Sequence, residues 1–304
     1  MIEAAARRPG SLGFRIAASS APPDWQTIDS VWATAGELGV FDAGWMSDHL
    51  SDVSREQGGG AFETVAMAGA LAHRVAGMWI GVAVFAATFR HPAVLAKAAT
   101  VLDNASGGRF ILGLGAGWHE GEHRAFGIPL LSPRERFDRF ESYVQVVRAL
   151  FSEEARGASG VTRDDAYFPL NGATMEPPPL QPAGPPLWLG GTRRRSIALA
   201  ARFADGWPMP GNRPGDVEYF SDRRDALLRA LEEVGRDPQT FTFAGQLNCG
   251  SSAAERRQAL EASRGMLRAG AHHLILGIPA GAGAGALRAV AEQVAWPLRQ
   301  EIGR

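Results

Sequence analysis

Short apolar runs alternate along the chain with longer segments whose apolar residues recur every three or four positions. The short runs predict strands over residues 13–18, 43–47, 78–85, 109–115, 187–190, 206–209, 241–247 and 272–278. The segments between them predict amphipathic helices, one of which carries an apolar stripe at Phe137, Phe140, Val144, Val147 and Phe151. Each predicted strand is therefore followed by a predicted helix.

Cap and turn residues lie where this alternation requires them. Asp24 is a predicted N-cap of the first helix and Gly39 a predicted end. Pro92 suits the first turn of a later helix. Ser252, followed three residues later by Glu255, has the pattern of a capping box. Local signals and the long-range pattern thus agree on where helices begin and end.

Eight strand–helix units predict an α/β fold, a single (β/α)8 TIM barrel, in preference to an open doubly wound sheet. The rhythm is interrupted over residues 152–186, a stretch rich in Pro and Gly in which residues 164–170 are expected to form a small hairpin. Because the alternation resumes afterwards, we interpret this stretch as an insertion between units four and five. The sequence therefore predicts one domain over residues 1–304.

The charges of the chain nearly cancel, with 31 Lys and Arg against 32 Asp and Glu. This balance gives no general attraction to nucleic acid or to an anionic membrane. Residues 78–89, the longest apolar run, fall short of the about 20 residues that a membrane span needs, and residues 1–10 lack a signal-peptide pattern. Cys249 is the one cysteine, which excludes an internal disulfide and favours a cytoplasmic setting.

Active sites of such barrels lie at the C-terminal ends of the strands. Asp48 and His49 follow the second predicted strand, where a histidine beside a carboxylate is a candidate acid–base group. Gly113, Gly115 and Gly117 end the fourth strand without the spacing of a dinucleotide fingerprint. These glycines either make room inside a crowded barrel or form a platform for a flat aromatic ring.

The fifth predicted strand is followed by Gly190, Gly191 and Thr192, which open a helix. Glycines let a backbone approach a ligand, and a helix N-terminus offers free N–H groups, so this turn suits a phosphate group. The next residues, Arg193–Arg195, add three positive charges. The alternative interpretation is a simple chain turn followed by a solvated helix face.

His119, Glu120 and His123 match the zinc-binding pattern H-E-x-x-H. That motif needs a stable helix that places both histidines on one face, but Gly121 lies in its middle and a barrel strand directly precedes it. We therefore predict no metal site at these residues. The chain also lacks the Gly-x-Ser-x-Gly turn of α/β-hydrolases.

Several ordered motifs cover roughly the first two thirds of the chain. They are residues 39–50, ending in Trp45-Met46-Ser47-Asp48-His49-Leu50, residues 88–97, residues 106–118, residues 126–129, residues 135–138, residues 185–191 and residues 200–207. On these motifs the chain resembles the luciferase-like monooxygenase superfamily, and more closely its coenzyme F420-dependent oxidoreductases. That family is built on a (β/α)8 barrel, the fold that the alternation predicts independently.

The resemblance implies roles for individual residues. Asp48 and His49 would face the ring of the deazaflavin, with His49 as the catalytic proton or charge partner near the hydride-carrying carbon. A bulge behind the ring, which in relatives contains a non-prolyl cis peptide bond, would comprise Ala83, Val84 and Phe85. The remaining cofactor-binding residues would be Ala116, Gly117, Trp118, Gly190, Gly191 and Thr192.

Two departures from the family restrict the substrate. The branch that oxidises sugar phosphates has a glutamate as general acid where this chain has Trp118, and it binds the substrate phosphate with lysines. Lys97, the only lysine here, lies within a predicted helix. The resemblance therefore argues against glucose 6-phosphate, and a replacement proton donor would come from Glu120, Glu122 or His123.

Together these observations favour an F420-dependent oxidoreductase that transfers a hydride to or from a small-molecule organic substrate. One alternative is a monooxygenase of the same superfamily that uses reduced FMN and O₂, and another is a non-catalytic flavin-binding barrel. The glutamate tail of F420 would favour Arg193–Arg195 as a docking patch, whereas FMN would need only the phosphate site. Relatives commonly pair into dimers, so the resemblance also allows a homodimer.

Overall fold

A computed structural model describes residues 10–16, 24–51, 60–75, 77–279 and 283–303. Within this part of the chain, eight parallel strands close into a barrel in the order β1-β10-β9-β8-β7-β4-β3-β2. The strands are β1 (Ser11–Ile16), β2 (Ala43–Met46), β3 (Trp79–Ala86), β4 (Phe110–Gly115), β7 (Leu187–Leu189), β8 (Gly206–Pro208), β9 (Thr242–Asn248) and β10 (His273–Ile278). The predicted TIM barrel is confirmed; residues 17 and 18 of the first predicted strand lie outside the described residues.

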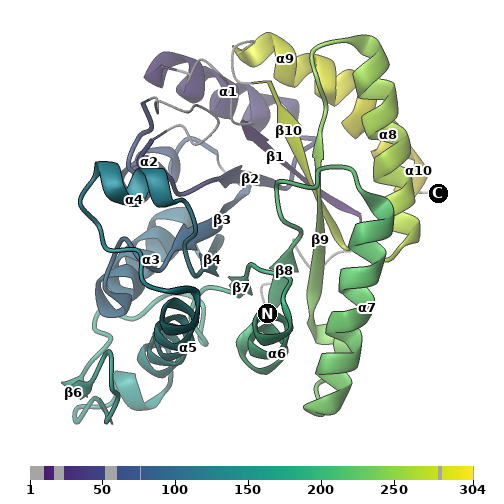
Figure 1. The fold of residues 1–304 in the computed structure, drawn as a ribbon. Helices are drawn as coiled ribbons and strands as arrows, with labels where there is room; N and C mark the ends of the chain where they lie inside the picture. The colour runs from purple at the N-terminus through teal and green to yellow at the C-terminus, as the bar shows by residue number, and fades with distance from the viewer. Residues whose placement is uncertain (1–9, 17–23, 52–59, 76, 280–282, 304) are drawn as a thin grey trace.

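Helices surround the barrel (Figure 1). They are α1 (Trp25–Leu38), α2 (Thr64–Leu71), α3 (Pro92–Ser106), α4 (Glu120–Ala125), α5 (Pro133–Leu150), α6 (Arg194–Phe203), α7 (Val217–Glu233), α8 (Ala253–Arg268), α9 (Gly283–Val290) and α10 (Trp296–Ile302), with a π-helical turn, Ala291–Ala295, between the last two. Asp24 caps α1 by accepting a hydrogen bond from the N–H of Thr27, and Gly39 ends it with a left-handed φ of 62°. Ser252 and Glu255 form the reciprocal capping box at α8.

The interior of the barrel is filled by side chains that alternate along the strands. The inner cluster comprises Ala43, Trp45, Trp79, Ile111, Trp188, Ala244 and Ile275. Trp45 Nε1 donates to His273 Nε2 at 2.8 Å, and burial, with a smaller contribution from Arg299, lowers the pKa of His273 to about 3, so this ring is neutral. A Cβ on Gly81 would lie 2.4 Å from the Trp45 ring. The packed interior leaves the strand ends as the place for a ligand.

The segment between α5 and β7 contains a two-stranded antiparallel sheet, β5 (Val161–Arg163) and β6 (Leu170–Ala173). The predicted hairpin over 164–170 is therefore displaced, because most of those residues form the connection. Asp165 turns the chain there, since its Oδ1 accepts hydrogen bonds from the N–H groups of Tyr167 and Phe168 at 2.9 Å. Lys97 Nζ donates to the carbonyl of Glu176 at 2.8 Å, which ties α3 to this segment.

Two features bear on the setting of the molecule. Cys249 is a buried free thiol just after β9, and burial raises its pKa to about 12. Among the described residues we find no helix with the length and apolar composition that a membrane crossing requires. The cytoplasmic location stays a prediction.

Candidate active site at the barrel mouth

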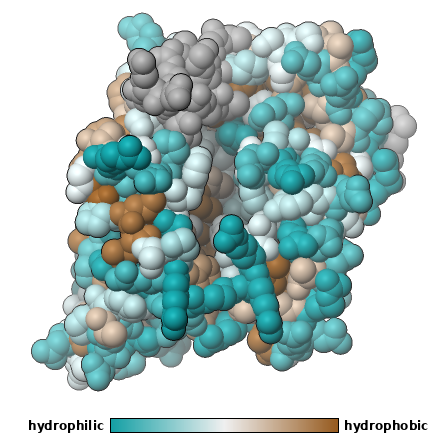
Figure 2. Space-filling view, viewed as in Figure 1, coloured by the Kyte–Doolittle hydropathy of each residue, from teal (hydrophilic) through white to brown (hydrophobic). Residues whose placement is uncertain are grey.

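The C-terminal ends of the strands form a mouth whose two halves differ in chemistry. On the β3, β4 and β7 side the inward positions are small, with Ala83, Gly113, Gly115 and Gly190. On the β1 and β9 side the residues at the mouth are polar, with Arg15 and Asn248. Figure 2 shows the molecule hollowed between the side that carries α4 and the side that carries α7, with hydrophobic residues beside the hollow on the α4 side and hydrophilic residues at its lower edge.

Strand β3 carries the predicted bulge. Its register with β4 shifts between Val82 and Phe85, and the Ala83–Val84 peptide bond is cis. The Val84 side chain lies against the inward faces of Gly113, Gly115 and Gly190: a Cβ on any of the three would lie 2.6 to 3.3 Å from a Val84 methyl carbon. Gly115 and Gly190 therefore make room for Val84, and Gly113 makes room for the Val82 carbonyl as well, 2.0 Å from where its Cβ would lie, as the interpretation of a crowded barrel predicts. Phe85 is fully buried in the outer core, beneath the guanidinium of Arg90.

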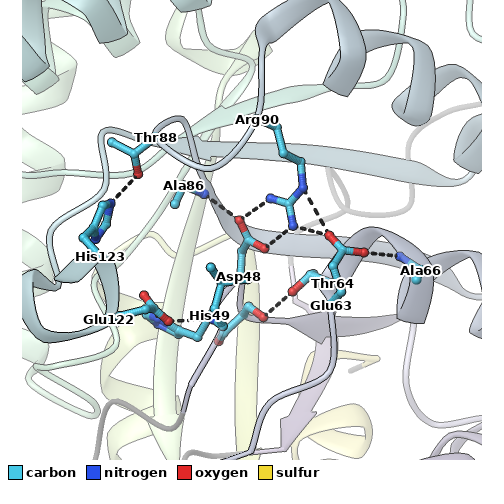
Figure 3. Close-up of polar contacts among 12 residues, drawn as sticks. Asp48, His49, Glu63, Thr64, Ala66, Ala86, Thr88, Arg90, Glu122 and His123 are labelled. Atoms are coloured by element: carbon cyan, nitrogen blue, oxygen red, sulfur yellow. Dashed lines mark hydrogen bonds and ion pairs between the residues drawn. The ribbon is translucent and has the colours of Figure 1, made fainter. Parts of the chain in front are cut away.

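Asp48 is buried at the end of β2 and is paired by Arg90 (Figure 3). Arg90 Nη1 and Nη2 donate to Oδ2 and Oδ1 at 2.7 and 2.9 Å, and the Ala86 N–H donates to Oδ2 at 2.9 Å. Arg90 also contacts Glu63, which caps α2 through the Ala66 N–H at 2.7 Å. This network joins the ends of β2 and β3 to α2. Both oxygens of the Asp48 carboxylate accept hydrogen bonds from other residues of the protein.

His49 follows Asp48 and is oriented by Glu122 of α4. The His49 Nδ1 to Glu122 Oε1 distance is 3.3 Å, and the exposed fractions of the two side chains are 26% and 1%. Glu122 Oε2 also accepts from the N–H groups of Leu50 and Ser51 at 2.6 and 3.2 Å. Burial alone would raise the pKa of Glu122, but the hydrogen bonds from His49 and the two N–H groups outweigh it and lower that pKa.

The state of Glu122 assigns the hydrogen on His49. An ionised carboxylate only accepts hydrogen bonds, so the contact requires a hydrogen on Nδ1 of His49. Nε2 of His49 is then the atom that can give or take a proton. The ring also meets Trp118 edge-on at a centroid distance of 6.3 Å, and Trp118 is 63% exposed.

The histidines of the zinc-like motif have other partners. His119 is the N-cap of α4, where its Nδ1 accepts from the N–H of Glu122 at 3.0 Å. His123 is buried, with Nδ1 2.8 Å from the His119 carbonyl and Nε2 2.8 Å from Thr88 Oγ1. Among the described residues no three His, Cys, Asp or Glu side chains are grouped closely enough to bind a metal.

In the Gly190–Thr192 turn the Gly190 N–H already donates to the Leu114 carbonyl at 2.9 Å, so only the N–H groups that follow it could meet a ligand. Trp207 Nε1 donates to the Gly191 carbonyl at 2.9 Å, and Arg223 Nη1 donates to the Thr192 carbonyl at 3.3 Å. Because N–H and C=O of a trans peptide point in opposite directions, the next N–H groups face away from β8 and α7. Arg193, the N-cap of α6, makes no side-chain capping bond, so these groups can bind an anion.

The three arginines after this turn have different surroundings. Arg195 pairs with Asp138 at 2.6 Å and lies over the Phe137 ring, so it belongs to the contact between α6 and α5. Arg193 and Arg194 are exposed, and neither forms an ion pair within the described residues. The docking patch expected at 193–195 therefore reduces to two available cations.

A cavity of about 120 Å³ adjoins Ala116. It is lined by Ala87, Thr88, Ala116, Pro129, Leu131, Arg136, Arg139, Phe140 and Tyr143. The Tyr143 hydroxyl is buried and has no hydrogen-bond partner within the described residues, and burial raises its pKa. An unpaired buried hydroxyl beside two arginines fits a polar, anionic group of a ligand. Ala116, which lines this cavity, is one of the residues that the family resemblance assigns to the cofactor.

Sequence reasoning did not identify Arg90, Glu63 or Tyr143. Arg90 and Glu63 act on other side chains, and no spacing in the sequence shows such a partnership. Tyr143 lies on the apolar face of α5, where the sequence pattern predicts a core residue for any aromatic side chain. Glu122 was one of three candidate proton donors, and the structure distinguishes it by its contact with His49; Glu120 is exposed and pairs with Arg124.

Comparison with known proteins identifies the family. The model of the luciferase-like monooxygenase family matches residues 12–300. The phthiodiolone/phenolphthiodiolone dimycocerosates ketoreductase of Mycobacterium kansasii is 32% identical over 237 residues, which is 72% of this chain and 61% of that protein. The chain thus spans less than two thirds of the length of this relative.

Two further proteins show the range of cofactors among similar proteins. The FMNH(2)-dependent dimethylsulfone monooxygenase of Pseudomonas putida is 31% identical over 121 residues, 40% of this chain and 32% of that protein. The structure of an F420-dependent secondary alcohol dehydrogenase in complex with an F420–acetone adduct has the same fold, with a TM-score of 0.73, 17% identity, and coverage of 93% of this chain and 98% of that chain. The match over 12–300 decides the assignment: the chain belongs to the luciferase-like monooxygenase family.

Proposed function

We propose that this chain is an F420-dependent oxidoreductase that transfers a hydride between the deazaflavin and the carbonyl or alcohol carbon of a small organic substrate. The pairing of His49 with Glu122 at the barrel mouth carries this proposal, because hydride transfer to a carbonyl also needs a proton for the oxygen. A similar protein is named a ketoreductase. A carbonyl substrate is consistent with both observations.

His49, Glu122, Asp48 and Arg90 have different roles in the proposed reaction. A bound deazaflavin would supply the hydride, which no side chain of the protein can do. In carbonyl reduction a new C–H bond forms, the carbonyl π electrons move to oxygen, and that oxygen takes a proton from Nε2 of His49. In the reverse direction Nε2 accepts the hydroxyl proton. Glu122 keeps the ring in place and balances the positive charge of its protonated form, and Asp48 with Arg90 holds the strand end that carries His49.

F420 is favoured over FMN by charge at the rim. The turn at Gly190–Thr192 could hold the phosphate of either cofactor, but only F420 adds a tail of several glutamates. Arg193 and Arg194 are exposed next to this turn and have no ion-pair partner within the described residues. A polyanionic tail would supply the partner that these two cations lack.

Equilibrium titrations with F420 and with FMN, followed by fluorescence, test the proposal. We expect tighter binding of F420, and the double change Arg193→Ser with Arg194→Ser to weaken F420 about tenfold or more while changing FMN affinity by less than about threefold. Arg202→Ser is the matched control, because it removes a cation from the other end of α6, where it pairs with Glu141. Micromolar FMN binding without F420 binding would refute the choice of cofactor.

The second candidate, a monooxygenase that uses reduced FMN and O₂, is supported by the relative named an FMNH(2)-dependent monooxygenase. Turnover by the unaltered chain separates both enzymes from the non-catalytic flavin-binding barrel, and His49→Ala then tests whether His49 takes part in the reaction. We expect this variant to keep its cofactor affinity and to lose turnover by about 100-fold or more. Unchanged turnover would remove His49 from the mechanism.

A further inference from the structure

Arg15 is a charged residue in the inner layer of the barrel mouth. Two residues before it in β1, Gly13 faces inward, since a Cβ there would lie 2.5 Å from Trp45 Nε1. Strand side chains alternate with a period of two, so Arg15 also faces the interior. It is aligned with Gly277 of β10 and Trp45 of β2 and is the last inward position of β1.

The partners of Arg15 are neutral. Nη2 donates to Asn248 Oδ1 at 3.2 Å, at the end of β9. Nε is buried and has no hydrogen-bond partner within the described residues. The group with the largest electrostatic effect on Arg15 is the thiol of Cys249. Burial raises the pKa of that thiol to about 12, so at neutral pH it carries no charge that would balance Arg15.

A half-buried guanidinium without a counter-charge is costly, since a desolvated charge is normally paired. Burial lowers the pKa of Arg15 from its usual value, because desolvation disfavours the charged form. No carboxylate of the described residues forms an ion pair with it, in contrast to Arg90, Arg148 and Arg299, which each have one. Arg15 is therefore suited to an anion that comes from outside the protein.

We propose that Arg15, with Asn248 beside it, binds a carboxylate of the substrate on the β1–β9 side of the mouth; this rests on the proposed function, which places the cofactor on the opposite side. A planar guanidinium matches the two oxygens of a carboxylate. Nη2, which donates to the neutral Asn248 Oδ1, supplies a donor, and the exposed amide of Asn248 supplies a second polar group. The preferred substrates are then oxo acids or hydroxy acids.

The position also explains why the two halves of the mouth differ. On the β3, β4 and β7 side, Val84 packs against glycines and contributes apolar surface. Arg15 of β1 is separated from β3 by β2, and Asn248 of β9 is separated from β7 by β8. A substrate held at Arg15 would extend its carbonyl across the mouth toward the ring side, where His49 follows β2.

The test compares acids with their neutral esters. Isothermal titration calorimetry is carried out on the full chain, with and without bound cofactor, using levulinate, phenylpyruvate and acetylbenzoate, each against its methyl ester. We expect at least one acid to bind about tenfold or more tightly than its ester, an increment of about 1.4 kcal/mol. Arg15→Met should abolish this preference, and Arg15→Lys, which keeps the charge but not the planar fork, should retain part of it.

Arg268→Met is the matched control, because it removes an exposed arginine from α8 and should leave the preference unchanged. Equal binding of every acid and its ester, or an acid preference that survives in Arg15→Met, overturns the proposal. Cofactor titrations on the same samples separate the two ideas. If neither F420 nor FMN binds but an Arg15-dependent acid preference exists, the proposed function fails and the carboxylate site stands.

Discussion

Replacing Glu122 by Gln tests how the mouth controls His49. Glu122 Oε2 accepts from the N–H groups of Leu50 at 2.6 Å and Ser51 at 3.2 Å. Both groups are donors, so the oxygen of a glutamine must take this position. The NH₂ group then occupies the position of Oε1, opposite Nδ1 of His49.

Two donors cannot share one hydrogen bond, so the neutral ring must change its tautomer. In Glu122→Gln, Nδ1 of His49 becomes the acceptor and the hydrogen moves to Nε2. Nε2 then no longer accepts a proton from an alcohol, and a protonated ring has no carboxylate to balance it. Because a positioned acid–base group typically contributes about 10²–10⁴-fold, we expect kcat to fall about 100-fold or more with little change in KM or cofactor affinity.

The stability change can be worked from the same contacts. Hydrogen bonds to a charged acceptor contribute about 1.5–3 kcal/mol and neutral ones about 0.5–1.5, so converting the two backbone bonds costs about 2 kcal/mol. The hydrogen bonds around Glu122 lower its pKa in the folded state. Its stabilising effect is therefore complete above its unfolded pKa, about 4.3, and is lost as the pH falls below that value. The difference between the two proteins should shrink in the same range.

Nitrogen-15 NMR of the imidazole rings measures the tautomer directly, with His49→Ala to assign the signal. We expect a shift from the Nδ1–H form to the Nε2–H form in Glu122→Gln, and no shift in the control Glu120→Gln, which alters an exposed neighbour on α4. Thermal unfolding at pH 7 and near pH 4 supplies the second measurement. A His49 that keeps its hydrogen on Nδ1 in Glu122→Gln would show that the carboxylate does not set the tautomer.

Two further substitutions test the frame of the site. Arg90→Leu leaves the buried carboxylate of Asp48 without its ion pair, so urea denaturation should show a free energy of unfolding lower by about 3 kcal/mol. Arg74→Leu removes an exposed ion pair and should lower it by less than about 1 kcal/mol. Equal losses would contradict the importance of burial. Gly81→Ala forces a methyl group against a buried indole and should cost about 1–3 kcal/mol. Gly69→Ala in α2 has free space and should be neutral or stabilising by up to about 1 kcal/mol, and thermal unfolding that ranks the two alike would refute this account of the interior.

The fold could be predicted because the hydrophobic pattern and the local cap and turn signals indicate the same elements. The apolar runs, the caps at Asp24 and Ser252, and the left-handed glycine at Gly39 are local, and the structure has each of them. The prediction placed the small hairpin too narrowly, over 164–170. A side-chain turn at Asp165 takes those residues out of the strands, and its two hydrogen bonds compete with strand pairing in a way that no periodicity shows.

The site could be predicted only where it depends on strand ends. His49 was identified because it follows β2, and the bulge at Ala83 and Val84 because the family has one. Glu122 reaches His49 from α4, 73 residues further along the chain, and that approach depends on how the loop after β4 returns over the mouth. Such contacts depend on tertiary packing, which the spacing of residues in the sequence does not predict.

Arg15 shows what a sequence pattern can still contribute once the topology is known. Ser11, Gly13 and Arg15 occupy alternate positions of β1, and the first two face the barrel interior. A charged residue as the third member of an inward series is out of place in a packed core, so it must lie at the open end of the barrel. The alternation thus locates this cation at the mouth, and its Nε, buried without a partner among the described residues, shows that the guanidinium is not fully satisfied by the protein. Arg90, which supports the fold, differs in having its carboxylate partner within the barrel, in Asp48.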